Sequence, residues 1–191
     1  MPTSFTLHCL GCPYAESLHL GDSFTTSAAS PLSMENNGAR TLLIFQSPGV
    51  EEWRVKRPLA SLHGGSAGDK IRRAFARVGK TREDFNITNS VQCYQGKLQA
   101  QGKLAPRDKK PSEIARKHCA NWLRLDIEKY DYSRIVVFGA VAMKSVLSLN
   151  CFPDAKTIYL PHPSAGLSNE KLLAALGNTA SEVSTTMTSR P

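Results

Sequence analysis

Four short segments of the chain are rich in apolar and β-branched residues, and the first and the last are followed by residues typical of a turn. They are Thr41 to Phe45, Phe85 to Val91, Arg134 to Gly139 and Thr157 to Leu160. Short runs of this kind are typical of buried strands. Because strands buried on both faces occur mostly in parallel sheets, the pattern predicts a mostly parallel, four-stranded sheet with helices on both sides.

Helical periodicity fills the stretches between these strands. From Ser66 to Val78, the apolar residues Ile71, Phe75 and Val78 share one stripe, as expected of a helix packed on a sheet. Pro111-Ser112-Glu113 predicts the start of a second helix, since proline is tolerated in a first helical turn. A third helix, Ala140 to Leu147, follows a glycine after the third strand. The expected fold class is α/β, with three layers in the order α/β/α.

The chain has 191 residues, which is enough for one hydrophobic core. We expect one domain over residues 1–177 and a disordered tail over residues 178–191, which ends in STTMTSRP. No apolar run approaches the roughly 18 residues that a membrane span requires. The N-terminal residues also lack the basic-then-apolar pattern of a signal peptide. A cytoplasmic monomer without membrane contact is therefore expected.

An excess of basic residues gives the chain a formal net charge of +8, which favours a polyanionic partner. Between Lys97 and Lys117, seven basic residues accompany two acidic ones, with Lys109 and Lys110 near the middle. A solvated loop and helix surface would explain this stretch as well as a phosphate-binding surface does. By itself, the stretch is weak support for a nucleic-acid partner.

Polar residues follow three of the predicted strands. Gln46-Ser47-Pro48-Gly49 comes after the first, Asn89 lies near the end of the second, and His162-Pro163-Ser164 comes after the fourth. Taken singly, such residues are more often turn formers than functional groups. Ligands of parallel α/β sheets, however, bind outside the carboxyl ends of the strands. The sequence therefore predicts that these residues line one binding site.

Four of the five cysteines are arranged as metal ligands often are. Cys9 and Cys12 form a C-x-x-C pair, Cys93 follows the second strand, and Cys119 lies on the helix after the basic stretch. Four thiolates suit either tetrahedral zinc or a [4Fe–4S] cluster, so the residues alone leave both open. Cys151 lies apart from this pattern and is expected to be a buried or free thiol.

In combination, these motifs resemble the family-four, iron–sulfur uracil-DNA glycosylases over roughly Phe5 to Leu173. The motifs follow one another in the same order as in that family. They are Cys9 and Cys12, Pro48-Gly49, Pro58 before Ser66-Ala67-Gly68, Ile87 to Cys93, Pro111 to Ile114, Cys119, Val136 to Ala140, and His162-Pro163-Ser164. Any one of them is a weak signal, whereas the ordered set is specific.

The resemblance implies a DNA glycosylase that acts on a base flipped out of the helix. With DNA as the partner, Lys109 and Lys110 of the basic stretch are expected to contact it. It also implies that Cys9, Cys12, Cys93 and Cys119 hold a structural [4Fe–4S] cluster, which favours iron over zinc. No lysine lies in the shared motifs, so a Schiff base is not expected and water would be the nucleophile.

The resemblance also implies roles for the residues after the strands. His162 would donate to the carbonyl of the departing base, and Asn89 would bind the base edge through its amide. The backbone from Gln46 to Gly49 would hold the pyrimidine and the attacking water, with Pro163 and Ser164 completing the substrate site. Leu167 would insert into the DNA as a wedge in place of the flipped base.

The chain departs from the family at the residues that would activate water. Gln46 stands in place of a glutamate, and a neutral amide is no general base near pH 7. Ser47 stands where related branches of the superfamily hold the water with Asp or Asn. Glu51 or Glu52 is expected to supply the missing carboxylate, unless both simply belong to a solvated helical turn.

A second departure concerns the pocket wall. Leu59 replaces a phenylalanine that stacks on uracil in the family, and an insertion over residues 60–65 follows it. His63 in this insertion would contact the base or its substituent, or be exposed. A missing ring and an added loop would reshape the pocket. We therefore expect the substrate to be uracil or, as these departures favour, a bulkier modified pyrimidine. An example is the glucosylated hydroxymethylcytosine of phage DNA, which would imply an antiviral role.

Two other functions stay open. The first is a catalytically inactive protein of the same fold that binds lesions or abasic sites. It is favoured by Gln46 and Ser47, and it is opposed by His162 and Asn89. The second is a zinc-stabilised nucleotide-binding protein unrelated to DNA repair, which the brown colour of an iron–sulfur cluster would count against.

Overall fold

The computed structural model describes Cys9, Cys12 and residues 31–61, 64–98, 108–150 and 157–177. Its strands are β1 (Thr41–Phe45), β2 (Asn86–Asn89), β3 (Arg134–Phe138) and β4 (Thr157–Leu160). Its helices are α3 (Val50–Val55), α4 (Ala67–Arg77), the 3₁₀ helix η1 (Arg82–Asp84), α5 (Glu113–Glu128), α6 (Ala140–Leu147) and α7 (Asn169–Gly177). The tail expected over residues 178–191 lies outside the described residues, as do His63 and Cys151.

The four strands form one sheet in the order β2-β1-β3-β4. Every neighbouring pair is parallel, and at the carboxyl ends Phe45 pairs with Asn89 and Phe138 pairs with Leu160. The carboxyl ends of all four strands therefore lie along the same edge of the sheet. The four-stranded parallel sheet predicted from the apolar segments is confirmed.

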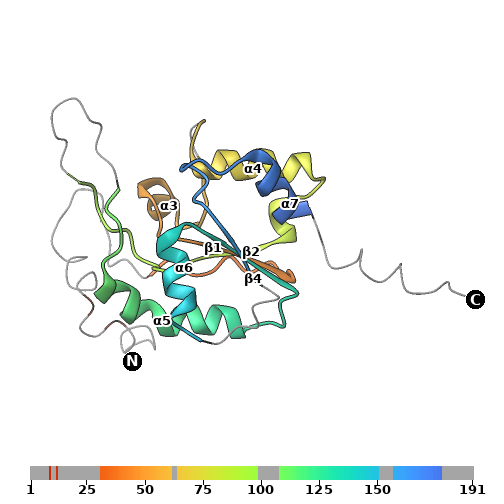
Figure 1. Cartoon of the computed structure of the whole chain (residues 1–191). Helices are drawn as coiled ribbons and strands as arrows, with labels where there is room; N and C mark the ends of the chain where they lie inside the picture. Colours follow the sequence, from red (N-terminus) through yellow and green to blue (C-terminus); the bar gives the residue numbers. More distant parts are fainter. Residues whose placement is uncertain are drawn as a thin grey trace, which may run out of the picture.

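Successive residues of each strand point to opposite faces of the sheet, and this divides the apolar core in two. Leu43 and Phe45 of β1 pack with α4 and α7 on one face. Leu42 and Ile44 pack with α5 and α6 on the other face. Figure 1 shows these two helical layers on either side of the strands. The predicted α/β/α order of layers is confirmed.

Two of the helices begin at serines whose side chains cap them. The Ser66 hydroxyl accepts from the Asp69 N–H at the start of α4 (3.1 Å), and the Ser112 hydroxyl accepts from the Ala115 N–H at the start of α5 (3.2 Å). Such caps satisfy N–H groups that have no partner within the helix. Both helices agree with those predicted from Ser66 and from Pro111. None of the described helices has the length and apolar character needed to cross a membrane.

Candidate active site

A pocket of about 420 Å³ lies at the carboxyl ends of β1 and β4, a size typical of small-ligand sites. Its walls come from the turn after β1, the segment before α4, the start of α4, Asp108 and the loop after β4. The described residues that line it are Phe45, Gln46, Ser47, Pro48, Gly49, Val50, Glu51, Glu52, Leu59, Ala60, Ser66, Ala67, Gly68, Asp108, His162 and Ser164. The structure thus brings most of the residues predicted after the strands around one cavity.

His162 belongs to a tight turn after β4, in which the Ala165 N–H donates to the His162 carbonyl (2.8 Å). The backbone N–H of Ser164 donates to Nδ1 of His162 (3.2 Å). Burial lowers the pKa of His162 below its ordinary value of 6.5, which keeps the imidazole neutral near pH 7. Because Nδ1 accepts a hydrogen bond, the ring proton lies on Nε2, which is therefore a donor.

Two residues outside the predicted site fix the histidine loop (residues 162–167). Lys70 Nζ of α4 donates to the carbonyls of Pro163 (3.1 Å) and Leu167 (2.6 Å). On the other side, Gly139 precedes α6 with a φ of 91°, and a Cβ at this position would lie 3.3 Å from the His162 Cβ. The loop is therefore held between α4 and the turn that joins β3 to α6.

We expect the substitution Gly139→Ala to displace His162 and to lower the free energy of unfolding by about 1–3 kcal/mol. An added methyl group would meet the His162 Cβ, and alanine disfavours the positive φ. Thermal unfolding and the NMR shifts of the imidazole nitrogens measure the two effects. Gly38→Ala is the matched control, since Gly38 also has a positive φ (69°) but nothing lies within 4 Å of its Cβ position. Unchanged imidazole shifts in Gly139→Ala would contradict the expectation.

The turn after β1 is tied to the end of β2. The Val91 N–H and the Ser90 hydroxyl both donate to the Gln46 carbonyl, at 3.0 Å and 2.8 Å. These bonds fix the backbone of the turn, while the half-buried side chains of Gln46 and Ser47 line the pocket. The structure therefore places both residues where the sequence predicts them.

Glu51 and Glu52 both line the pocket, and Glu52 also connects two of its segments. The Glu52 carboxylate accepts from the backbone N–H groups of Gly49 (2.5 Å) and Leu59, and so joins the β1 turn to the pocket wall. Burial raises the pKa of Glu52 to about 7, while these two donors act in the opposite direction. Glu52 therefore does not belong to a solvated turn, and its two oxygens are occupied by the backbone.

Asn89 is fully buried at the end of β2. It pairs with Phe45, so the two side chains lie on the same face of the sheet, and Phe45 lines the pocket. Neither polar atom of its amide has a hydrogen-bond partner in the described part of the chain. Asn89 does not itself belong to the described lining of the pocket, but it lies beside the pocket residue Phe45 on the neighbouring strand.

Leu167 and Leu59 lie in the core on the α4–α7 side. Leu167 is only 3% exposed, which contradicts the expectation of an exposed DNA wedge. Its side chain belongs to the same apolar cluster as Leu172 of α7. Leu59 is 5% exposed and also contributes to the pocket wall, as the sequence predicts. Pro163 is buried beside the pocket but is absent from its described lining.

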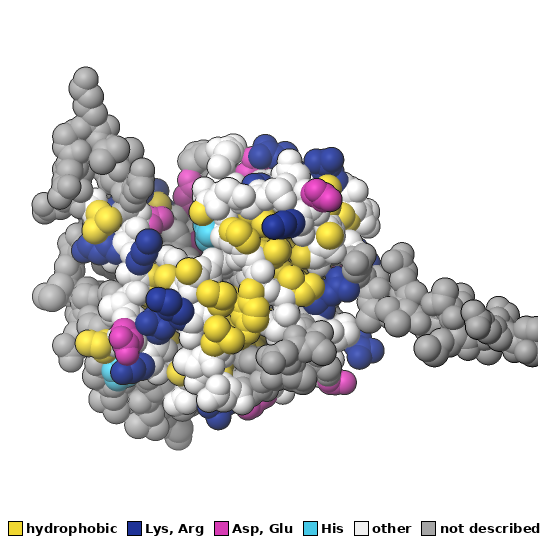
Figure 2. Space-filling view, in the orientation of Figure 1, with side chains coloured by type: hydrophobic (Ala, Val, Ile, Leu, Met, Phe, Trp, Pro, Cys, Tyr) yellow, Lys and Arg dark blue, Asp and Glu magenta, His cyan; other side chains and the backbone are white. Residues whose placement is uncertain are grey.

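Lys109 and Lys110 are exposed and directly follow the pocket residue Asp108. The Lys109 N–H donates to the Gly96 carbonyl (2.9 Å), which anchors the pair next to the segment after β2. Figure 2 shows Lys and Arg side chains distributed over both helical layers, with acidic side chains among them. On this face the basic side chains are therefore scattered and do not form one continuous patch.

The four predicted cysteine ligands are close enough to interact electrostatically. Cys12, Cys93 and Cys119 are buried, and all four are free thiols. Burial raises the pKa of Cys119 to about 12, to which repulsion from Cys12 and Cys9 adds, and the pKa of Cys93 also rises. In the described residues, however, no group of three or more His, Cys, Asp or Glu side chains has the arrangement of a metal site. The donor chemistry is suitable for a cationic cluster, since buried thiolates require a compensating charge.

Sequence reasoning missed Asp108, Lys70 and the role of Gly68. Asp108 lies in the stretch from Lys97 to Lys117, whose basic residues alone suggested a function. In the structure it lines the pocket and accepts a hydrogen bond from the Tyr94 hydroxyl (3.3 Å). Lys70 binds only main-chain carbonyls, and no sequence signal marks such a partner. Gly68 belongs to the Ser-Ala-Gly motif, and its Cβ position lies 2.9 Å from the Ala60 carbonyl oxygen, so no side chain fits there.

Comparison with known proteins places this pocket in a family. Residues 33–184 match the family model of the Uracil DNA glycosylase superfamily. No curated protein matches the chain. The matched residues include all four strands and nearly all of the described chain. The chain therefore belongs to the uracil DNA glycosylase superfamily.

Proposed function

We propose that the protein is a DNA glycosylase that hydrolyses the N-glycosidic bond of a flipped-out pyrimidine and leaves an abasic site. The superfamily supports the reaction class. The observation that carries the proposal is the neutral His162, whose Nδ1 is occupied by Ser164 N–H and whose side chain lines a pocket of about 420 Å³. That arrangement provides a fixed Nε2 donor at a cavity of a size that suits a single base.

The chemistry of the reaction explains this choice of residue. As the N-glycosidic bond breaks, negative charge develops on the departing base and positive charge on the sugar. A preorganised donor aimed at the base is worth several kcal/mol when water is excluded. His162 supplies such a donor. Asn89 would bind the base edge, because a buried amide without a partner costs about 1–3 kcal/mol, a cost that hydrogen bonds to a base would remove.

A water molecule is the proposed nucleophile, held by Ser47 and Glu51. Both residues line the pocket, next to the turn after β1. Glu51 would supply the carboxylate that Gln46 lacks. Its negative charge would also favour the positive charge that develops on the sugar.

The proposed substrate is a pyrimidine with a hydroxyl-bearing 5-substituent, such as glucosylated hydroxymethylcytosine. Leu59 packs into the core and places no aromatic ring in the pocket. The side chains of Gln46, Glu51 and Asp108 offer the acceptors that hydroxyl groups require. Because such bases occur in phage DNA, we propose an antiviral role.

We further propose that Cys9, Cys12, Cys93 and Cys119 hold a [4Fe–4S] cluster with a structural role. The support is that all four are free thiols and that three of them are buried. Cys119 lies on α5 and Cys93 follows β2, so a cluster would link the helical layer to the sheet edge. The cluster would contribute folding free energy in the way that structural metals do.

The proposed function is tested by base release from a panel of otherwise identical DNAs. The panel carries uracil, thymine, 5-hydroxymethylcytosine or glucosylated hydroxymethylcytosine at one position, in single and double strands. We expect abasic sites on the glucosylated DNA, formed about tenfold or more faster than on uracil DNA. Alkaline cleavage at the abasic site and mass spectrometry of the released base measure the rates.

Two results would overturn parts of this proposal. Robust release of uracil with none from the glucosylated DNA would refute the proposed substrate, but the proposed glycosylase activity would stand. Release from no DNA in the panel, combined with equal DNA affinity of the wild type and His162→Ala, would instead favour an inactive lesion-binding protein.

A further inference from the structure

Leu59 in the pocket wall has a backbone conformation that leucine rarely adopts. Its φ is 53°, in the left-handed region, which costs a residue with a Cβ about 1–2 kcal/mol. Such conformations persist only where the surrounding contacts determine them fully. The contacts of this residue therefore indicate what fixes the wall.

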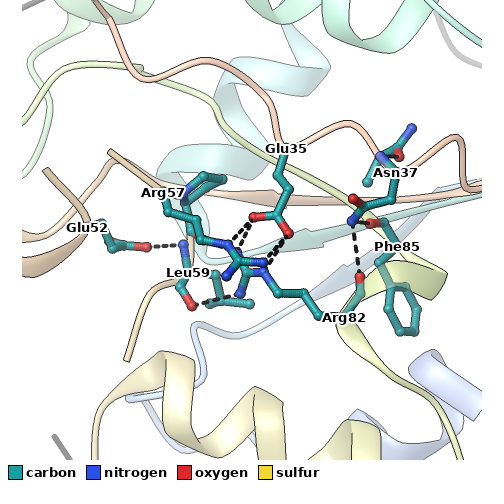
Figure 3. A network of polar contacts seen from close by, with 9 residues as sticks. Glu35, Asn37, Glu52, Arg57, Leu59, Arg82 and Phe85 are labelled. Atoms are coloured by element: carbon teal, nitrogen blue, oxygen red, sulfur yellow. Dashed lines mark hydrogen bonds and ion pairs between the residues drawn. The ribbon is translucent and has the colours of Figure 1, made fainter. Parts of the chain in front are cut away.

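Three hydrogen bonds hold the wall by its main chain (Figure 3). The Leu59 N–H donates to Glu52, and Arg82 Nη1 donates to the Leu59 carbonyl (3.1 Å). Arg82 Nη2 donates to the carbonyl of Pro58. Both neighbouring peptide groups are thus fixed by side chains from α3 and η1, which belong to other parts of the chain.

Arg82 is held in turn by Glu35. Its Nε and Nη2 donate to the two oxygens of that carboxylate, each at 2.6 Å. Arg57 approaches the same carboxylate from the other side, at 2.9 Å and 3.0 Å. Burial raises the pKa of Glu35, but the hydrogen bonds and charges of Arg57 and Arg82 outweigh it and lower the pKa to about 2. The ion pair is therefore intact at neutral pH.

The two arginines differ in their exposure and in their contacts with the pocket wall. The Arg82 side chain is 19% exposed and contacts the wall carbonyls, whereas the Arg57 side chain is 53% exposed. In the described residues, no hydrogen bond joins Arg57 to either wall carbonyl. A planar guanidinium can serve a carboxylate and two carbonyls at once, and Arg82 does so here.

We propose that Arg82, held by Glu35, is a positioning residue that sets the specificity of the pocket. It keeps Leu59 in the left-handed conformation, with the side chain in the core, and so keeps the pocket wide enough for a substituted pyrimidine. This inference rests on the proposed glycosylase function. It adds a residue that touches no substrate and acts through the main chain of the wall.

The test compares Arg82→Gln with Arg57→Gln, each on full-length protein and on DNA with uracil or glucosylated hydroxymethylcytosine. Both variants remove one charge next to Glu35, but only the first releases the wall. We expect Arg82→Gln to lower the ratio of kcat/KM for the glucosylated base to that for uracil by about tenfold. Arg57→Gln should change that ratio by less than about twofold, as expected of an exposed ion pair. Equal changes in both variants, or an unchanged ratio in Arg82→Gln, would overturn the inference.

A binding measurement separates failure of this inference from failure of the proposed function. DNA with the same bases on 2′-fluoro sugars resists cleavage, so its Kd reports pocket size without turnover. If the wild type releases no base, the proposed function fails, and the same tenfold ratio of Kd values decides the role of Arg82. Should Arg82→Gln be insoluble, Arg82→Lys replaces it, because lysine keeps the charge but lacks the several donors of the planar guanidinium. We then expect the ratio of Kd values to shift by about threefold in the same direction. An unchanged ratio there would also overturn the inference.

Discussion

Replacing His162 with alanine is expected to lower the rate of base release by about 10²–10³-fold, with little change in DNA affinity. The reason is that Nε2 is the donor that the pocket presents to a departing base, and alanine offers no substitute. Single-turnover rates at saturating enzyme measure the effect. Ser164→Ala should retain the Nε2 donor, because the group that donates to Nδ1 is the backbone N–H, which alanine keeps. A His162→Ala rate within a few-fold of the wild type would mean that another group stabilises the base.

The pH dependence of the wild-type rate tests the same donor in a different way. Burial lowers the pKa of His162 below 6.5, so the neutral form persists above that value. The rate should therefore be constant with respect to this group from pH 7 upward and fall as the pH drops through the lowered pKa. Below the lowered pKa, Nδ1 is protonated and can no longer accept from the Ser164 N–H, so the bond that orients the ring is lost. The His162→Ala variant should lack this acidic limb.

If the proposed cluster is bound, replacing Cys93 or Cys119 with serine is expected to abolish the brown colour that it gives and to lower the melting temperature by more than about 10 °C. Both thiols are buried, so loss of a bound cluster would leave a polar group and neighbouring thiols without compensating charge. Iron and sulfide content, visible absorbance and thermal unfolding measure the effects.

Cys151→Ser serves as the control for those two variants, since Cys151 lies apart from the four-cysteine pattern in the sequence. It should keep the colour, the iron content and the melting temperature. A colourless wild type that contains one zinc ion per chain would refute the iron–sulfur proposal and favour tetrahedral zinc.

The strands could be predicted because their signal is local. The bounds of β1 and β4 agree with the predicted apolar segments, since each segment ends at turn residues. The second strand is shorter than predicted, because Ser90 and Val91 leave it to donate to Phe45 and Gln46. The histidine and the β1 turn could be placed in one site because parallel strands deliver their carboxyl ends to one edge.

The supports of the pocket could not be predicted, because they act on the main chain of distant segments. Arg82 binds the carbonyls of Pro58 and Leu59, and Lys70 binds carbonyls of the histidine loop. Every residue has a main-chain carbonyl, so the residue types of the contacted segment do not indicate that a side chain will bind there. Leu167 was misplaced for a different reason. The resemblance to the family implied a DNA wedge, whereas three-dimensional packing places Leu167 in the core with residues of α7.

Helix α4 contacts both sides of the pocket, the wall and the histidine loop. Gly68 lies against the carbonyls of Leu59 and Ala60, and Lys70, two residues later, binds those of Pro163 and Leu167. Any displacement of the helix carries the wall and the histidine loop together, so the gap between them stays constant. We therefore expect the wall and the histidine loop to keep their spacing when a ligand binds between them. A ligand wider than the gap would first have to detach Lys70 from two carbonyls.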